Sequence, residues 1–150
     1  MRYLTLAGLT MLIGTIASGA ALGAQQAQVY STSGCGCCVS WVRHLEENGY
    51  RARVENLDMG ALMLRKVDAG LGPDLAACHT AEIDGYLVEG HVPAREIDRL
   101  LAERPDAVGL VVPGMPSGSP GMGEPTPDME PYDVLLLKQD GSTEVYASYP

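Results

Sequence analysis

Residues 28–48 read QVYSTSGCGCCVSWVRHLEEN and place a group of cysteines between a predicted strand and a predicted helix. The short run 28–31 is β-prone. From about residue 38 to residue 48 the pattern is helical, because Trp41, Val42 and Leu45 recur on one side. Gly49 follows at a position where helix C-termini favour glycine. The sequence therefore predicts a strand that leads into a cysteine motif at the N-terminus of a helix.

The segments that follow alternate between predicted strands and helices. Residues 50–57 alternate in polarity as a strand does, and Asp58 can cap a helix that runs through residue 67. Residues 80–83 and 86–88 flank an Asp-Gly pair, which is typical of a β-hairpin, and residues 93–103 predict a third helix. This order, with the cysteines after the first strand, predicts an α/β fold of the thioredoxin-like type.

Residues 112–131 depart from this alternation. They read VPGMPSGSPGMGEPTPDMEP, and this density of proline and glycine leaves no regular helix or strand. Residues 132–137 and 143–148, with a turn at 140–141, predict a final β-hairpin. We therefore expect one domain over residues 28–150, with an added loop rich in Met, Pro and Gly (112–131) and a C-terminal β-hairpin (132–149).

The first 24 residues are typical of a secretory signal peptide. Arg2 precedes an uncharged stretch, and small residues gather at its end, so that cleavage after Ala20, Gly23 or Ala24 fits the pattern. The alternative is a permanent membrane anchor, because about 20 apolar residues can span a bilayer. The abundance of Gly, Ala and Thr favours a cleaved signal. We expect a periplasmic protein without stable membrane insertion after cleavage, in a compartment that permits disulfides.

The composition limits the range of functions. Hydrophobic residues make up 46% of the 150 residues and charged residues 19%, which is not the composition of a disordered chain. The net charge of −9 argues against nucleic acid as a partner, because phosphates attract basic surfaces.

Cys35, Cys37 and Cys38 lie within four residues at a helix N-terminus, and Cys78 is the only other cysteine. The unpaired N–H groups and the dipole of the helix favour thiolate there, and a thiolate is either a redox nucleophile or a soft metal ligand. The alternative is a pair of structural disulfides, although adjacent Cys37 and Cys38 bond to each other only with strain. In a thioredoxin-like fold the loop that carries Cys78 lies beside the motif, so we expect the four thiols to converge on a metal cluster.

Imidazole and thioether side chains extend this donor set. His79 and His91 lie near the cysteine elements and are candidate ligands, whereas His44 lies on a helix face that is expected to be solvated. Met59 and Met63 are expected to fill the core. Three further methionines lie in the loop, where no helix or strand is expected to turn them toward the core: Met115, Met122 and Met129. They either cover the domain or bind metal, and thioether prefers Cu(I). The set favours copper over zinc.

Four stretches in this order resemble the family of small exported copper-resistance proteins typified by CopG. They are residues 32–41 (TSGCGCCVSW), 78–80 (CHT), 85–93 (GYLVEGHVP) and 109–122 (GLVVPGMPSGSPGM). The resemblance implies a cysteine-bridged multicopper centre with an oxidoreductase role in copper handling. It implies that copper is bound or bridged by three cysteines, with a fourth thiol, methionines and histidines completing the site: Cys35, Cys37, Cys38, Cys78, Met115, Met122, His79 and His91.

One feature departs from the wider thioredoxin pattern. In that family a cis-proline usually faces the redox cysteines, whereas here residues 78–80 (CHT) occupy the place without a proline. This favours metal chemistry over ordinary dithiol–disulfide exchange.

Two functions therefore compete. The first is a periplasmic copper-binding protein that stores copper or cycles it between Cu(I) and Cu(II), with copper ions and other periplasmic copper-handling proteins as partners. The alternative is a thiol–disulfide oxidoreductase in which Cys35 attacks and Cys38 resolves. An exported module held together only by structural disulfides is a third hypothesis.

Overall fold

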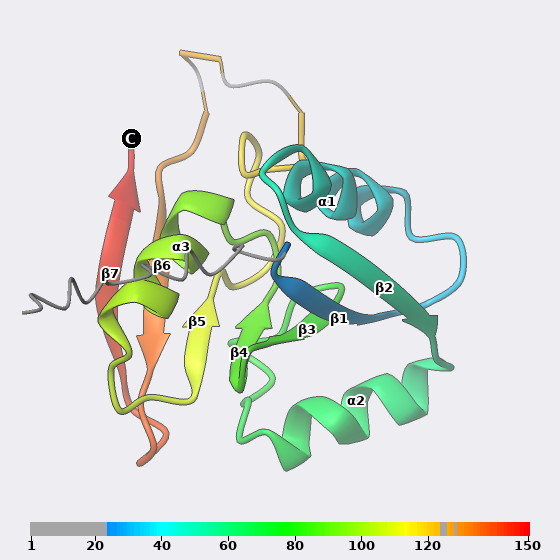
Figure 1. Cartoon of the computed structure of the whole chain (residues 1–150), viewed down its shortest axis with the longest axis horizontal. Helices are drawn as coiled ribbons and strands as arrows, with labels where there is room; N and C mark the ends of the chain where they lie inside the picture. The colour runs from blue at the N-terminus through cyan, green and yellow to red at the C-terminus, as the bar shows by residue number, and fades with distance from the viewer. Residues whose placement is uncertain (1–23, 124–125, 128) are drawn as a thin grey trace, which may run out of the picture.

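The computed structural model describes residues 24–123, 126–127 and 129–150. Strands and helices follow one another in the order β1 (Gln26–Ser31), α1 (Gly36–Glu47), β2 (Arg51–Asn56), α2 (Met59–Asp68), β3 (Thr80–Ile83), β4 (Tyr86–Glu89), α3 (Ala94–Glu103), β5 (Gly109–Val111), β6 (Tyr132–Leu137) and β7 (Thr143–Tyr149). Figure 1 shows this arrangement. The predicted α/β class is confirmed, and the thioredoxin-like assignment stays a prediction.

The seven strands form one sheet in the order β2-β1-β3-β4-β5-β6-β7. The pairs β1/β2 and β4/β5 are parallel, and the other neighbours are antiparallel. Because β1 and β3 run in opposite directions, the end of β1 and the start of β3 lie at the same edge of the sheet, where Tyr30 pairs with Thr80. The cysteine motif follows β1 and Cys78 precedes β3, so this topology brings both cysteine segments to one place.

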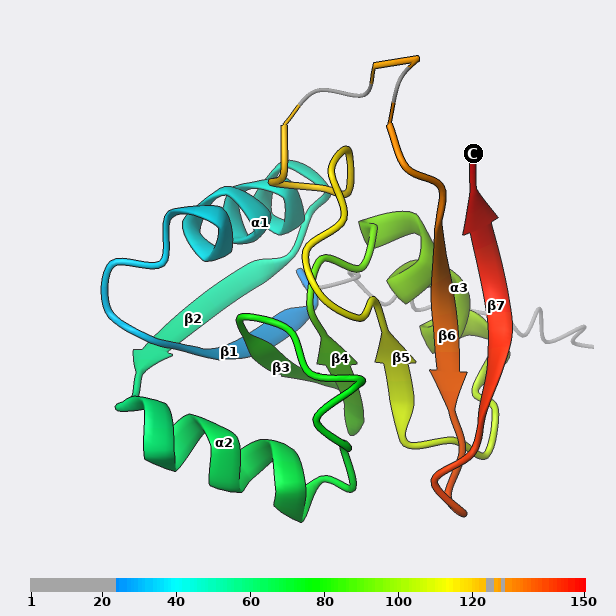
Figure 2. The same ribbon diagram turned by 180° about the vertical axis from the view of Figure 1, so that it is seen from behind.

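Helices cover both faces of the sheet. On one face Trp41 and Leu45 of α1 and Ile97 of α3 join the main core, which includes Val29 of β1. Tyr30 follows Val29 and points to the opposite face, where the guanidinium of Arg65 lies 3.6 Å from its ring. Arg65 belongs to α2, so α2 covers the face away from α1 and α3. Figure 2 views the molecule from this side.

Two expectations about helix surfaces are wrong. Met59 and Met63 do not fill the core, since 61% and 36% of their surfaces are exposed. Only one side of α2 meets the sheet, and Leu62 together with the long side chain of Lys66 occupies that side. His44 is half-buried rather than solvated, because its Nε2 atom accepts a hydrogen bond of 3.0 Å from the N–H of Ala94 at the start of α3.

The signal peptide predicted for residues 1–24 lies outside the described residues except for Ala24. Among the described helices, none is both long and apolar enough to cross a membrane.

A buried ion pair lies between α2 and the sheet. Lys66 and Glu89 are 1% and 0% exposed, and the Lys66 Nζ atom contacts a carboxylate oxygen of Glu89. The same ammonium donates to the Thr80 hydroxyl at 2.7 Å, and that hydroxyl donates to the second Glu89 oxygen at 2.5 Å. The N–H of Ala77 donates to Glu89 at 2.6 Å. Every charged atom therefore has a partner, which a buried charge requires.

We predict that Lys66→Met lowers the free energy of unfolding by about 3–5 kcal/mol, because it leaves the Glu89 carboxylate buried without a counter-charge. The control is Lys138→Met, which removes the same group from an exposed pair with Glu144 and is expected to cost less than about 1 kcal/mol. Urea unfolding measures both values. Adding Glu89→Gln to Lys66→Met should recover part of the loss, and equal losses for the two single variants would contradict the prediction.

Candidate metal centre

The cysteine motif forms the first turn of α1. The helix begins at Gly36, two residues earlier than the sequence pattern indicates, and Cys35 is its N-cap residue. Cys37 and Cys38 therefore lie in the turn whose backbone N–H groups have no partner within the helix. The turn before it needs glycine at position 34, where φ is +82°. The sulfurs are thus held at the positive end of the helix dipole, which stabilises thiolates.

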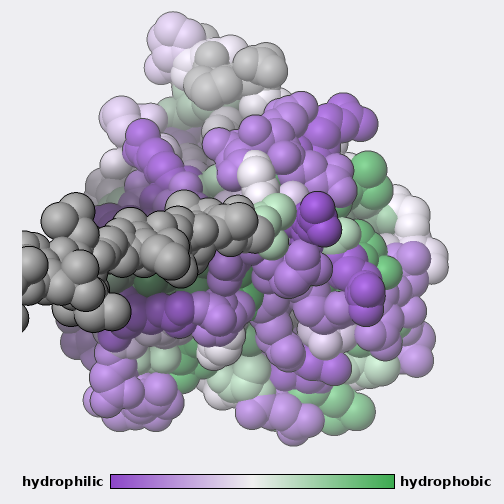
Figure 3. All heavy atoms as spheres, viewed as in Figure 1, coloured by the Kyte–Doolittle hydropathy of each residue, from purple (hydrophilic) through white to green (hydrophobic). Residues whose placement is uncertain are grey.

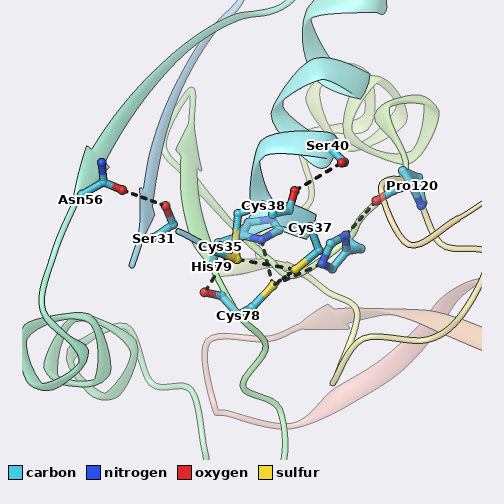
Figure 4. Close-up of a disulfide and its surroundings, with 11 residues drawn as sticks. Ser31, Cys35, Cys37, Cys38, Ser40, Asn56, Cys78, His79 and Pro120 are labelled. Carbon is cyan, nitrogen blue, oxygen red and sulfur yellow. Dashed lines mark hydrogen bonds between the residues drawn. A yellow bond between two sulfur atoms is a disulfide. The ribbon is translucent and has the colours of Figure 1, made fainter. Parts of the chain in front are cut away.

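Four cysteine sulfurs gather at this turn, as Figure 4 shows. Cys35 and Cys38 form a disulfide, whereas Cys37 and Cys78 are free. The Cys37 sulfur lies 3.5 Å from that of Cys35 and 3.5 Å from that of Cys78. All four sulfurs lie within 4.8 Å of one another. The expected convergence of the four thiols is confirmed, and one intramolecular disulfide forms within the motif.

His91 is oriented as a metal ligand would be. It follows β4, which pairs with β3, and its Nε2 atom lies 3.2 Å from the Cys78 sulfur. Its Nδ1 atom lies 2.7 Å from the carbonyl oxygen of Pro120, so the Nδ1–H group donates to that oxygen. This leaves the lone pair of Nε2 directed at the thiol. A hydrogen bond from the other ring nitrogen to a carbonyl is the usual support of a histidine ligand.

His79 lies deeper and has an unsatisfied nitrogen. Its side chain is 0% exposed, and its Nδ1 atom lies 3.4 Å from the Cys78 sulfur. The ring packs at 4.3 Å from Trp41 and meets His91 edge-on at 5.0 Å. Its Nε2 atom has no hydrogen-bond partner within the described part of the chain. A buried nitrogen without a partner is rare and fits a site that takes a metal ion.

The loop rich in Met, Pro and Gly (112–131) packs against the cysteine turn. A Cβ atom on Gly121 would lie 2.7 Å from the backbone nitrogen of Trp41 and 3.1 Å from the carbonyl oxygen of Cys37. Only glycine, with φ at +87°, permits this approach of the loop to the first turn of α1. Pro120 is its neighbour, so the loop both touches the cysteine turn and orients His91. The sequence reasoning did not identify Gly121 or Pro120, whose roles depend on backbone contacts.

The loop methionines occupy different environments. Met122 is half-buried and directly follows Gly121, and its N–H donates to the carbonyl of Ser119 at 2.9 Å. Met115 is 53% exposed. The Met129 sulfur packs against Gly118, where an added Cβ would lie only 2.0 Å away, so Met129 braces the loop. Of the two methionines predicted as ligands, Met122 is therefore next in sequence to Gly121, the residue that contacts the cysteine turn, whereas Met115 faces solvent.

Burial keeps Cys78 and His79 uncharged in the metal-free protein. Burial, followed by the hydrogen bond with Cys37, raises the pKa of the Cys78 thiol to about 12. Burial, together with the charges of His91 and Lys66, lowers the pKa of His79 to about 3. Cys78 is therefore protonated at neutral pH, and a metal that binds it must displace the proton. Thiols and neutral imidazoles suit a soft or borderline metal such as copper.

We predict that the metal-free protein loses stability as the pH falls below about 6.5. The folded pKa of His79, about 3, lies below its unfolded value, so the stabilisation is present above pH 6.5 and is lost on acidification. Burial also lowers the pKa values of His91 and His44. Between pH 7 and pH 5, His79 alone should cost about 2 kcal/mol.

Urea unfolding of the metal-free chain at the two pH values measures this loss. His79→Gln should flatten the pH dependence, because it removes the titrating ring. His44→Gln should leave the His79 contribution intact. The same stability at pH 7 and pH 5 would contradict the prediction.

Comparison with known proteins identifies relatives. Residues 75–122 match the family described as "Protein of unknown function, DUF411". No curated protein matches the chain significantly. Two solved structures titled copper resistance protein CopG resemble it closely. Form 2 is 41% identical over 84% of this chain and 98% of its own, with a TM-score of 0.75. Form 1 is 44% identical over 83% and 97%, with a TM-score of 0.74.

Almost the whole of each solved chain therefore has a counterpart in this chain. A copper-related role follows from these relatives together with the cluster of four cysteines. The chain belongs to the family of the copper resistance protein CopG.

Proposed function

We propose that this protein is an exported copper-binding protein of copper resistance, which holds several copper ions through shared cysteine thiolates and cycles them between Cu(I) and Cu(II). The observation that carries the proposal is the contact of Cys78 with two donor groups at once. Its sulfur belongs to the four-cysteine cluster and also to a cluster with His79 and His91. A single thiolate at the junction of two clusters is suited to bridging metal ions.

The proposed ligands belong to three chemical types. Thiolate donors come from Cys35, Cys37, Cys38 and Cys78, imidazole donors from His79 and His91, and thioether donors from Met122 and Met115. Thiolate and thioether stabilise Cu(I), whereas imidazole also binds Cu(II). A mixed set therefore accommodates both oxidation states without large differences in affinity, which redox cycling requires.

Full use of the thiolates requires reduction of the Cys35–Cys38 disulfide. A dithiol reductant supplies the two electrons and two protons that convert this bond into two thiols and is itself oxidised to a disulfide, and copper binding then releases the protons from the thiols. The disulfide also fits an oxidising compartment, and it supports export through the signal peptide proposed for residues 1–24. We propose a thioredoxin-like domain over residues 28–150 as the scaffold, with loop 112–131 as its cover and the hairpin 132–149 as added strands.

We predict that the reduced protein, titrated with Cu(I) without oxygen, binds more than one copper ion per chain. Elemental analysis measures the stoichiometry, and thiolate-to-copper charge-transfer absorption reports the bond type. Cys78→Ser should lower the number of ions bound and weaken affinity by about tenfold or more, because it removes the shared sulfur.

The methionines supply a matched pair of variants for the same titration. Met122→Leu should weaken copper affinity, whereas Met59→Leu changes an exposed thioether on α2 and should have no effect. Full copper binding by Cys78→Ser would contradict the proposed ligand set.

One observation favours a second candidate, a thiol–disulfide oxidoreductase. The bond between Cys35 and Cys38 is the one that such an enzyme would form, and Cys35 is the more exposed of the two. In the reduced enzyme the Cys35 thiolate would attack a substrate disulfide, and Cys38 would then displace the substrate thiol to regenerate the bond.

The two candidates are separated by assaying Cys78→Ser for copper stoichiometry and for disulfide reduction. The copper proposal predicts reduced copper binding in this variant. It also predicts that the wild-type protein binds copper but has little reductase turnover. Unchanged copper stoichiometry in Cys78→Ser, combined with reductase turnover that Cys35→Ser abolishes, would establish the oxidoreductase instead.

A further inference from the structure

Strand β2 presents an open edge of the sheet. Its six residues pair with β1 in a continuous parallel register from Arg51 to Asn56, and no other strand among the described residues pairs with its outer side. In Figure 1, β2 ends the sheet next to α1. An unpaired edge exposes backbone N–H and C=O groups that can bind another extended chain.

The opposite edge of the sheet is protected in a way that β2 is not. The register between β6 and β7 shifts at Val134 and Leu135, and such an irregularity disfavours further pairing. Tyr146 and Tyr149 of β7 lie under the guanidinium groups of Arg99 and Arg95 from α3. The pairing of β1 with β2 has no such shift.

An apolar pocket lies beside the open edge. It has a volume of about 270 Å³, and its lining includes Val39 and Val42 of α1, Val54 of β2 and the two disulfide cysteines. Val39 and Val54 are 60% and 45% exposed. Figure 3 shows apolar colour over the start of α1 and the adjacent part of β2, on a face that is largely hydrophilic. The pocket is smaller than a typical site for a drug-sized ligand, so it suits one apolar side chain.

The other face of β2 carries two arginines and one glutamate. Val54 lines the pocket, and because successive side chains alternate, Arg51, Arg53 and Glu55 point to the opposite face. Both arginines are exposed, and neither forms an ion pair with another described residue. In a chain of net charge −9, this face is net positive despite Glu55, so acidic side chains of a partner are favoured opposite Arg51 and Arg53.

We propose that the outer edge of β2 and the pocket beside the Cys35–Cys38 disulfide dock an extended segment of a partner protein, in which acidic and apolar residues alternate. The backbone of the segment extends the sheet, one apolar side chain enters the pocket, and the acidic side chains face Arg51 and Arg53. Cys37, Cys78 and the two histidines do not line this pocket. The proposal concerns the oxidised protein, in which Cys35 and Cys38 are joined by a disulfide, and its docking contacts come from β2 and from the valines of the pocket.

The test uses the oxidised, metal-free chain and a fluorescently labelled synthetic peptide. The peptide has the length of β2, alternates glutamate with valine and is capped at both ends. Fluorescence anisotropy should show saturable binding. Val54→Lys should weaken the binding by about tenfold or more, because it removes an apolar contact. Arg53→Glu should weaken it severalfold, and a peptide with lysine in place of glutamate should bind more weakly than the original.

Val145→Lys is the matched control, because Val145 is 57% exposed on β7 at the other edge of the sheet. It should leave peptide affinity unchanged, and circular dichroism checks the fold of every variant. Alternate N-methylation of the peptide should abolish binding if the backbone pairs with β2. The absence of saturable binding, or equal affinities for the Val54 and Val145 variants, would overturn the proposal. Concentration-dependent dimerisation that Val54→Lys abolishes would assign the edge to a second copy of the chain instead.

Discussion

The buried carboxylate of Glu89 holds together three parts of the chain on which the candidate site depends. It pairs with Lys66 of α2, accepts from the hydroxyl of Thr80 on β3, and accepts from the backbone of Ala77. Cys78 lies between Ala77 and Thr80, so both sides of this cysteine are anchored by one side chain. The anchor is strong because charges in a buried environment cannot exchange their partners for water.

The same anchor connects the site to its second histidine. Glu89 ends β4, and Gly90 donates from its backbone to the carbonyl of His79, which sets His91 beside Cys78. The loop then closes over this arrangement through Pro120. Trp41 donates from its indole to the carbonyl of Val92 and so ties the cysteine helix to the same segment. Backbone contacts thus help to position sulfur and imidazole groups from three separate segments, which are 35–38, 78–79 and 91.

The cysteine motif consequently has two sides with different environments. Cys37 meets Cys78, whose sulfur also contacts the two histidines, whereas Cys35 and Cys38 line an apolar pocket next to β2. This division follows from helical geometry, since residues separated by three positions share a side of a helix and the residue between them points elsewhere. We propose that the reduced four-cysteine cluster holds copper and that, in the oxidised protein, the pocket beside the Cys35–Cys38 disulfide meets a partner protein.

The sequence by itself determined the α/β class, the cysteine motif at a helix start and the likeness to the copper-resistance family, because these depend on local patterns and residue order. It misjudged Met59, Met63 and His44, since exposure on a helix depends on what packs against each side. The short β5 (Gly109–Val111) was also missed, because three residues carry no period. Only the tertiary structure decided the Cys35–Cys38 pairing, the unsatisfied nitrogen of His79 and the contact of Gly121 with α1. These features join residues that lie far apart in the chain or select among near-equivalent partners, and only the packing of the sheet, helices and loop chooses between them.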